Sequence, residues 1–263
     1  MSLDGAAVIA QLRLSHDRLV RELEVGGEAM LTEPSACTEW SVGRVVSHLG
    51  SGAEIATITL EAGLAGDQRG ASQEAMHEVW QLYDTLDDRA ATTRSISANA
   101  TLIDAFESLT PNELESLVVP FFTGPTPVSV FAGFRLAEHV VHTWDVVVVR
   151  DPAAELATDA AHIIVDAVVV PMVGRLSSDP VPGQPSVAVH LGDTDRQLVL
   201  EVEPTMSLRV LRPGDEPDAR LDMSTAAFVR LVYGRLGPGR TPDSAVGSDP
   251  TLLDRVRRMF PGF

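Results

Sequence analysis

The spacing of apolar residues changes once along this chain, and this change limits its possible folds more than any other feature. Up to about residue 176 the apolar residues recur with a period of about 3.6, which is typical of amphipathic helices. Beyond about residue 186 they alternate with a period of about two, which is typical of strands. The intervening segment Ser177–Ser186 is rich in proline and serine, which favours a linker. We therefore predict an all-α bundle over residues 1–176, followed by a small α+β domain over residues 186–263.

The helical part divides at its polar stretches. One helix carries the apolar residues from Val8 to Leu23, and a loop follows over Leu31–Glu39. Ser41 is expected to cap the second helix. A third helical region, over Ser72–Leu109, is expected to break between Thr92 and Ser97.

Prolines help to predict the loop and helix boundaries between residues 120 and 176. The Pro120–Pro127 stretch predicts a loop, and Pro127 fits the first turn of a helix that runs to about Arg150. A further helix is expected over Thr158–Leu176, with Pro171 kinking or ending it. Strands are expected where the apolar residues alternate, around residues 187–191, 198–202 and 208–210, and helices at about residues 224–233 and 249–259.

The charge and the basic residues exclude several function classes. Twenty basic and 37 acidic residues give a net charge of −17. Such a surface repels phosphate groups, so we expect neither nucleic acid nor an anionic membrane as a partner. All 20 basic residues are arginine. The absence of lysine excludes Schiff-base chemistry by lysine and a phosphate-binding lysine of the Walker type.

The cysteine count and the N-terminal sequence predict a cytoplasmic location. The one cysteine, Cys37, cannot form an internal disulfide, which fits a reducing compartment. The first residues lack the basic region of a signal peptide, and no apolar stretch is long enough to span a bilayer.

Three residues on the predicted helices could bind a divalent metal. Glu138 and His142 are four residues apart, so both side chains emerge on one face of their helix. His48 lies on a different helix, within an otherwise apolar stripe. One carboxylate and two imidazoles leave a coordination position open, as in catalytic zinc sites, and facing helices of a bundle commonly supply such ligands. On spacing alone, a surface ion pair and a core histidine are more common arrangements.

Three passages resemble the mycothiol-dependent maleylpyruvate isomerase family. Residues 37–49, CTEWSVGRVVSHL, are similar to the motif that ends in a metal-binding histidine. Residues 135–145, RLAEHVVHTWD, are similar to the motif that supplies the glutamate and a second histidine. The segment YGRL at residues 233–236, followed by VGSDP at residues 246–250, resembles the family's small C-terminal domain.

This resemblance implies a DinB-like four-helix bundle that binds a divalent metal through His48, Glu138 and His142. A set of two histidines and one glutamate suits zinc, although nickel, cobalt and iron accept the same donors. The resemblance also implies mycothiol, a sugar-bearing thiol, as cofactor or cosubstrate, and a small-molecule substrate. In the isomerase reaction the mycothiol thiolate adds to the cis double bond of maleylpyruvate. Rotation about the new single bond and elimination of the thiol then give fumarylpyruvate.

Arg235 is the candidate catalytic residue. By resemblance, an arginine of the C-terminal domain would bind a carboxylate of the substrate or the thiol, for which a bidentate guanidinium is suited. A structural salt bridge is the alternative. We expect the active site between the two domains, where ligand pockets are frequent.

The residues next to the candidate ligands in the sequence can also be assigned expected positions and contacts. His139 should point about 100° away from Glu138 and miss the metal. Asp145 could accept a hydrogen bond from a ligand imidazole or serve packing, and Arg135 could pair with Glu138. The remaining candidates are expected to be buried residues without a role in binding: Cys37, Trp40, Trp80 and Trp144.

The same residues leave two other functions open. A mycothiol S-transferase would conjugate the thiol to an electrophile and release the adduct. A non-catalytic regulatory protein would keep the metal-binding bundle. An assay of the products separates the two enzymes, because the isomerase regenerates the thiol and the transferase consumes it.

Overall fold

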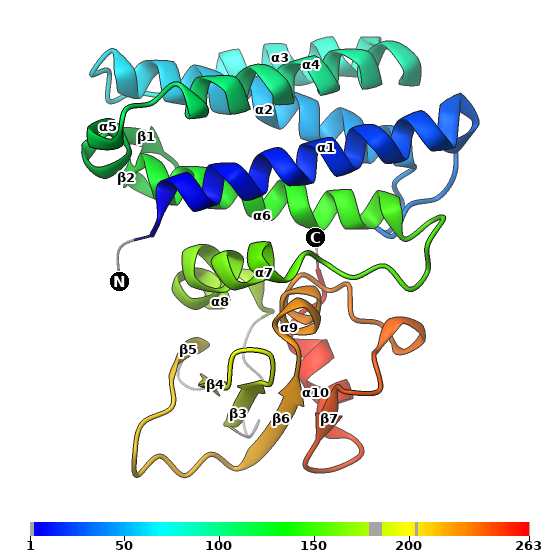
Figure 1. Cartoon of the computed structure of the whole chain (residues 1–263), viewed down its shortest axis with the longest axis vertical. Helices are drawn as coiled ribbons and strands as arrows, with labels where there is room; N and C mark the ends of the chain where they lie inside the picture. The colour runs from blue at the N-terminus through cyan, green and yellow to red at the C-terminus, as the bar shows by residue number, and fades with distance from the viewer. Residues whose placement is uncertain (1–2, 179–185, 203–204, 263) are drawn as a thin grey trace. The chain divides into compact units, whose positions relative to one another are not determined.

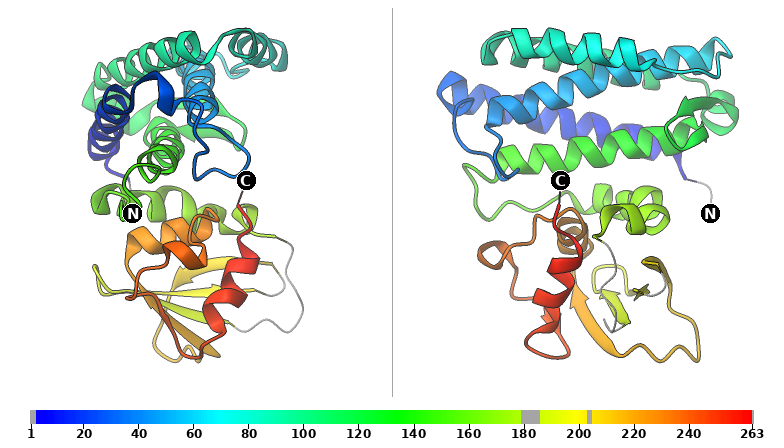
Figure 2. Two further views of the ribbon diagram at one scale, coloured as in Figure 1. Left: turned by 90° about the vertical axis from the view of Figure 1, so that its right-hand side faces the viewer. Right: turned by 180° about the vertical axis from the view of Figure 1, so that it is seen from behind.

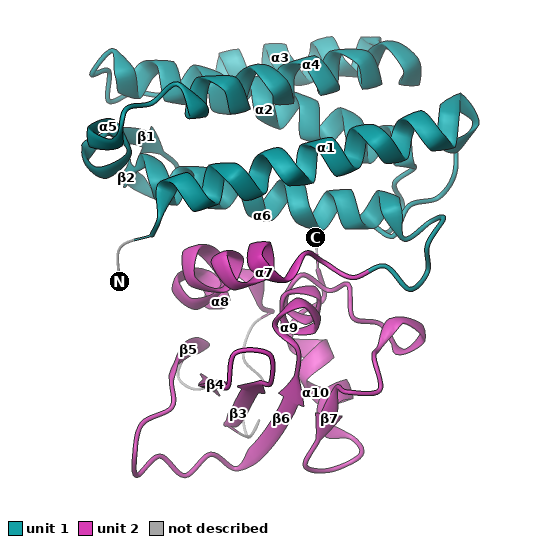
Figure 3. Cartoon of the chain, in the orientation of Figure 1, with its two compact units in different colours: residues 1–154 teal, residues 155–263 magenta. Residues whose placement is uncertain are grey.

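The computed structural model describes residues 3–178, 186–202 and 205–262 (Figure 1). They belong to two compact units, residues 1–154 and 155–263 (Figure 3). The first unit is built from helices and one small hairpin, and the second combines helices with a sheet. The predicted order of an all-α bundle and a small α+β domain is therefore confirmed. Most of the predicted linker, residues 179–185, lies outside the described residues.

Four long helices form the bundle of the first unit, and they are α1 (Gly5–Met30), α2 (Val42–Leu64), α4 (Asp88–Glu107) and α6 (Val128–Val147). Helices α1 and α2 each pack against both α4 and α6 (Figures 1 and 2). The apolar faces of all four meet in one core, which includes Leu12, Leu49, Leu102 and Leu136. The shorter α3 (Gln73–Thr85) packs against α2. None of the helices among the described residues is both long and apolar enough to cross a membrane.

Side-chain caps mark the first residues of α2 and α4. Ser41 caps α2 as predicted, because its Oγ accepts a hydrogen bond from Arg44 N at 3.2 Å. The break between α3 and α4 lies at residues 86–87, not between Thr92 and Ser97 as predicted. The Asp87 carboxylate caps α4 by accepting from Ala90 N at 2.7 Å. In contrast, the Ser95 hydroxyl donates to the carbonyl four residues earlier, which a continuous helix allows.

The predicted loop at Pro120–Pro127 is instead a β-hairpin of β1 (Val118–Phe121) and β2 (Gly124–Pro127). Its prolines are tolerated because both strands of a two-stranded sheet are edge strands, which leave backbone positions unpaired. The turn uses Gly124, whose φ of +100° favours glycine. A short helix that the sequence analysis did not predict, α5 (Pro111–Ser116), comes before the hairpin.

The second unit begins with one continuous helical segment. It consists of α7 (Thr158–Ile164), a π-helical turn (Val165–Val169) and α8 (Val170–Leu176). Pro171 does not end the segment, because it lies in the first turn of α8 and the helical conformation continues to Leu176. The regular α-helical pattern is interrupted by the π-helical turn directly before it. This segment packs on other elements of the second unit. The compact units therefore divide at residues 154 and 155, whereas the predicted first domain extended to residue 176.

The sheet of the second unit has the strand order β5-β4-β3-β6-β7. Its strands are β3 (Val187–Leu191), β4 (Arg196–Glu201), β5 (Ser207–Val210), β6 (Ala219–Met223) and β7 (Val246–Gly247). Strands β3 and β6 are parallel, and the other pairs are antiparallel. The sequence predicted β3, β4 and β5 but not β6 or β7. The two helices predicted near the end are present as α9 (Thr225–Val232) and α10 (Leu252–Met259), and α10 lies along β6 and β7 (Figure 2).

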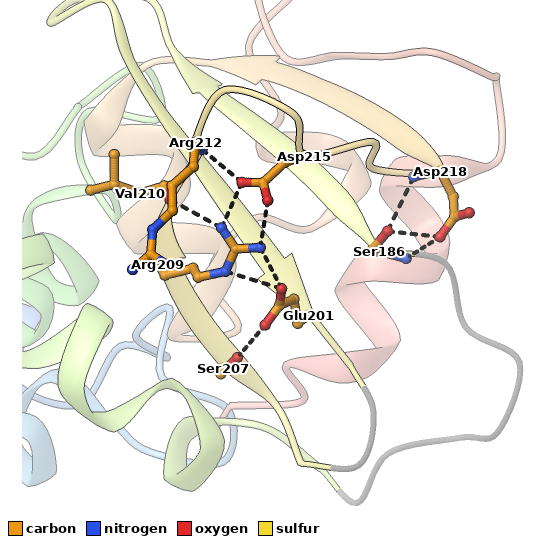
Figure 4. Close-up of polar contacts among 8 residues, drawn as sticks. All are labelled: Ser186, Glu201, Ser207, Arg209, Val210, Arg212, Asp215 and Asp218. Carbon is orange, nitrogen blue, oxygen red and sulfur yellow. Dashed lines mark hydrogen bonds and ion pairs between the residues drawn. The ribbon is translucent and has the colours of Figure 1, made fainter.

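Polar contacts fix the segment between β5 and β6 to the sheet (Figure 4). Arg209 on β5 donates to Glu201 Oε1 and to Asp215 Oδ2, both at 2.6 Å. These two carboxylates raise the pKa of Arg209. Asp218 accepts from the backbone nitrogen and the hydroxyl of Ser186 at 2.8 and 2.7 Å. Because Arg209 is committed to two carboxylates, we assign it a structural role.

Candidate metal site

His48 on α2 and the pair Glu138 and His142 on α6 come together in the first unit. His48 Nε2 lies 3.2 Å from Glu138 Oε2, and His142 Nε2 lies 3.8 Å from the same oxygen. One donor atom of each residue lies within 4.8 Å of the donor atoms of the other two. The structure therefore brings together the three side chains that were predicted as metal ligands.

The packing of α2 against α6 places this cluster at the edge of the core. Leu49, next to His48, and Ala137, next to Glu138, are buried in the bundle. The side chains of His48 and Glu138 keep about two fifths of their surface exposed, while His142 is more buried. Access from outside is thus combined with fixed helical backbones, as a site for an exchangeable ligand requires.

Asp145 fixes the orientation of the His142 ring. His142 Nδ1 lies 3.0 Å from Asp145 Oδ2, and Asp145 is fully buried. When Nδ1 donates to this carboxylate, Nε2 keeps its lone pair and faces the cluster. This contact is the one expected of a carboxylate that supports a ligand imidazole.

Trp40, which the sequence analysis treated only as a core residue, packs on both imidazoles. Its ring centroid lies 5.1 Å from that of His48 and 6.1 Å from that of His142, with an angle of 21° to the latter ring. The two imidazoles are themselves 5.0 Å apart. Trp40 thereby restricts the rotation of both rings. Its place in the same short passage as His48 was the only signal in the sequence.

The charges around Glu138 keep it ionised. Partial burial by itself would raise the pKa of Glu138, but the hydrogen bond with His48 and the nearby side chains of His142, His48 and Arg135 lower it to about 2. A carboxylate that is ionised at neutral pH suits a metal ligand.

Arg135 lies one helical turn before Glu138 and is only 8% exposed. Its Nη2 donates to Leu49 O at 3.4 Å, and among the described residues no carboxylate lies within ion-pair distance of it. The predicted direct pair with Glu138 is therefore not formed. Burial lowers the pKa of Arg135, an effect that the charge of Glu138 opposes.

His139 points away from the metal cluster, as predicted. Its Nδ1 lies 2.9 Å from Ser15 Oγ and 3.1 Å from Thr143 Oγ1, inside the bundle. The ring of His16 meets it edge-on, with centroids 5.8 Å apart. Burial, together with the charges of His16, Arg135 and His142, holds the pKa of His139 well below its ordinary value of 6.5.

A second group of possible ligands lies behind His142. Cys37, His142 and Asp145 each offer a donor atom within 4.8 Å of the others, and all three are buried. Cys37 is buried as predicted. Since His142 Nδ1 is already bonded to Asp145, and since an external ligand would have to reach a bound metal, the half-exposed cluster with His48 and Glu138 is the better candidate of the two groups.

The other predicted residues have different surroundings. Trp144 is a core residue as expected, and its Nε1 donates to Ala154 O at 2.7 Å. The prediction for Trp80 was wrong, because the Trp80 side chain is 48% exposed and α3 buries only Tyr83 against the bundle.

Arg235, in the second unit, is buried and donates from Nη1 to Tyr233 O at 2.8 Å. Its proposed role in binding remains a prediction.

Comparison with known proteins places these features in one family. The model of the mycothiol maleylpyruvate isomerase N-terminal domain matches residues 12–147, a range that includes His48, Glu138 and His142. No curated protein sequence matches the chain. Two solved structures are similar to it, namely a mycothiol-dependent maleylpyruvate isomerase and a variant of that enzyme in which a histidine is replaced by alanine. Both have a TM-score of 0.66 and 18% identity, and the match covers 94% of this chain and 96% of theirs.

At this low identity the structural likeness concerns the fold. The family model is a separate finding, and it spans more than half of the 263 residues. It covers the bundle helices with the three converging side chains. The chain therefore belongs to the mycothiol maleylpyruvate isomerase family.

Proposed function

We propose that this protein is an enzyme that binds one divalent cation through His48, Glu138 and His142, with zinc the best fit, and activates mycothiol for a reaction of the maleylpyruvate isomerase type. The convergence of the three donor atoms within 4.8 Å of one another carries the proposal. Two imidazoles and one carboxylate are a donor set that zinc accepts, with a further position left for an external ligand.

The need for activation follows from the chemistry of thiols. A free thiol has a pKa of about 8.5, so only a few per cent is thiolate at neutral pH. A divalent cation bound in this cluster would supply the positive charge that favours the thiolate. The residues of the chain set up the site for it: Asp145 orients His142, Trp40 restrains both imidazoles, and Glu138 is already ionised.

The isomerisation itself needs no oxidant or additional reactant. The thiolate sulfur bonds to one carbon of the cis double bond, and the displaced electron pair moves toward the conjugated carbonyl. The molecule then rotates about the resulting single bond. When the electron pair returns, the carbon–sulfur bond breaks, the trans double bond forms and the thiolate is regenerated. We further propose that Arg235 binds a carboxylate in this reaction, because a guanidinium can donate two hydrogen bonds to it.

A balance of products tests this function. The zinc-loaded protein is incubated with mycothiol and maleylpyruvate, and both fumarylpyruvate and total thiol are measured. We expect fumarylpyruvate to accumulate while total thiol stays constant. Loss of thiol in step with the acceptor would assign the protein as an S-transferase instead. Absence of thiol-dependent turnover in the zinc-loaded protein would contradict an enzymatic role and favour a regulatory one.

A further inference from the structure

A hollow of about 250 Å³ opens beside the metal ligand His48, between α2 and α3. Two tryptophans line it, Trp40 before α2 and Trp80 on α3, together with Ser47 and His48 of α2. Trp80 has no core to pack against and is 48% exposed. A large indole that is left half-exposed at a hollow is typical of a surface that binds a ligand.

Three hydrogen-bond donors at this hollow have no partner among the described residues. They are the indole nitrogens of Trp40 and Trp80 and the hydroxyl of Ser47. Ser47 is the most informative of them, because the residue is only 7% exposed, yet its hydroxyl oxygen is not among the buried polar atoms of the described residues that lack a partner and therefore still reaches solvent at the hollow. The neighbouring hydroxyl of Ser51, by comparison, donates to His48 O at 3.1 Å.

The charges at the hollow are already balanced. Arg44 Nη1 lies 2.8 Å from Asp84 Oδ1, and both residues line the hollow. The Arg44 guanidinium also lies 5.9 Å from the centre of the Trp40 ring. A dicarboxylate would therefore find no uncommitted cation here. A wholly apolar group would leave the Ser47 hydroxyl without a hydrogen bond.

A neutral ring that carries hydroxyl groups satisfies both conditions. Its C–H face can pack on an indole, and its hydroxyl oxygens can accept from the indole nitrogens and from Ser47. The geometry points to the hollow as the subsite that binds a sugar ring of mycothiol, beside the cluster that would hold its sulfur. We name Ser47, Trp40 and Trp80 the indole subsite. This inference rests on the proposed function, since it takes mycothiol as the thiol.

The first test measures binding to the zinc-loaded protein by calorimetry. The probes are mycothiol and its thiol-free part, N-acetylglucosaminyl-inositol. Trp80→Ala is expected to raise the dissociation constants of both probes about tenfold, because an exposed stacking surface is lost at little cost to folding. Trp80→Phe should recover part of this loss. Ser47→Ala should weaken both probes several-fold. Leu82→Ala is the matched control, since Leu82 is a partly exposed apolar residue on the same helix that does not line the hollow.

Steady-state kinetics provide the second readout. Trp80→Ala should raise the KM for mycothiol about tenfold and leave kcat at saturating thiol, zinc content and the KM for the acceptor unchanged. A raised KM for the acceptor alone would show that the hollow binds the acceptor and would overturn the proposal. The proposal would also be overturned if the wild-type protein turned over its substrate, did not bind the thiol-free probe, and was not affected by Trp80→Ala. Binding of that probe without any thiol-dependent turnover would uphold the indole subsite and reject the proposed function. Failure of the wild-type protein to bind either probe would overturn both.

Discussion

Asp145 decides which nitrogen of His142 faces the candidate metal site, through a contact of 3.0 Å between Asp145 Oδ2 and His142 Nδ1. Asp145→Asn keeps the size of the side chain but removes the negative charge, so the support of the imidazole weakens. We expect zinc affinity to fall about 10- to 100-fold, which is the usual effect of losing such a partner. Asp104→Asn, which alters an exposed ion pair with Arg13, is the control. Unchanged zinc affinity in Asp145→Asn, measured by competition with a chelator, would show that this contact serves packing only.

The low pKa of His139 should make the stability of the metal-free protein depend on pH. Its pKa is held well below 6.5 in the folded state, chiefly by burial, so it stays neutral there. Below about pH 6.5 the unfolded chain takes up a proton that the folded protein does not, and the free energy of unfolding falls by up to about 1.4 kcal/mol per pH unit for each such proton. His139→Gln should reduce this loss.

Urea unfolding at pH 7.5 and 5.5, with a chelator present, measures the effect. The control is His77→Gln, since His77 is exposed on α3. If His139→Gln and the wild-type protein lost equal stability between these pH values, His139 would not be the group responsible.

The three metal-ligand candidates could be predicted because helical spacing fixes which side chains share a face, and because the passages around them resemble a known family. The roles of Trp40 and Trp80 could not be predicted. Their exposure depends on how α3 and the segment before α2 pack, which the composition of the chain does not reveal. The same holds for Arg135, whose direct pairing with Glu138 was expected but is not formed.

At the scale of elements, the close approach of α2 and α4 depends on Gly50. A Cβ atom added there would lie 2.2 Å from Ser95 Oγ and 2.6 Å from Ser95 Cα. Alanine favours a helix over glycine by about 1 kcal/mol, but overpacking a core costs about 1–3 kcal/mol, and here backbone must move. Gly50→Ala should therefore lower the free energy of unfolding, and zinc affinity should fall as well because α2 carries His48.

Urea denaturation checks this result against Gly192→Ala, where an added Cβ would meet nothing within 4 Å. The control is expected to change the free energy of unfolding by less than about 0.5 kcal/mol. A Gly50→Ala protein as stable as the wild type would contradict the close packing of the two helices.

Most helices and three strands could be predicted from apolar periodicity, and the misses have physical causes. The break before α4 follows from a single cap at Asp87, which competes with similar polar residues nearby. The hairpin at Pro120–Pro127 was hidden by its prolines, which edge strands tolerate. Strand β6 was missed because it offers few apolar residues, of which Leu221 and Met223 are buried.

At the scale of the whole molecule, a substitution of Arg235 tests whether the second unit takes part in the reaction. We expect Arg235→Ala to lower kcat/KM about 10- to 150-fold, the loss of a charge-assisted hydrogen bond of about 1.5–3 kcal/mol. Zinc content should stay unchanged, because the candidate ligands belong to the first unit. As Arg235 also donates to Tyr233 O, thermal unfolding of the variant must be measured in parallel. Full turnover by a folded Arg235→Ala protein would remove this residue from the reaction.

The central claim is that His48, Glu138 and His142 together hold one metal ion. The most direct test is the zinc content of the wild-type protein and of His48→Ala after loading and dialysis, measured by elemental analysis. We predict about one zinc ion per chain in the wild-type protein and almost none in His48→Ala, because two remaining ligands hold zinc weakly. A folded His48→Ala protein that retained one zinc ion per chain would contradict the account.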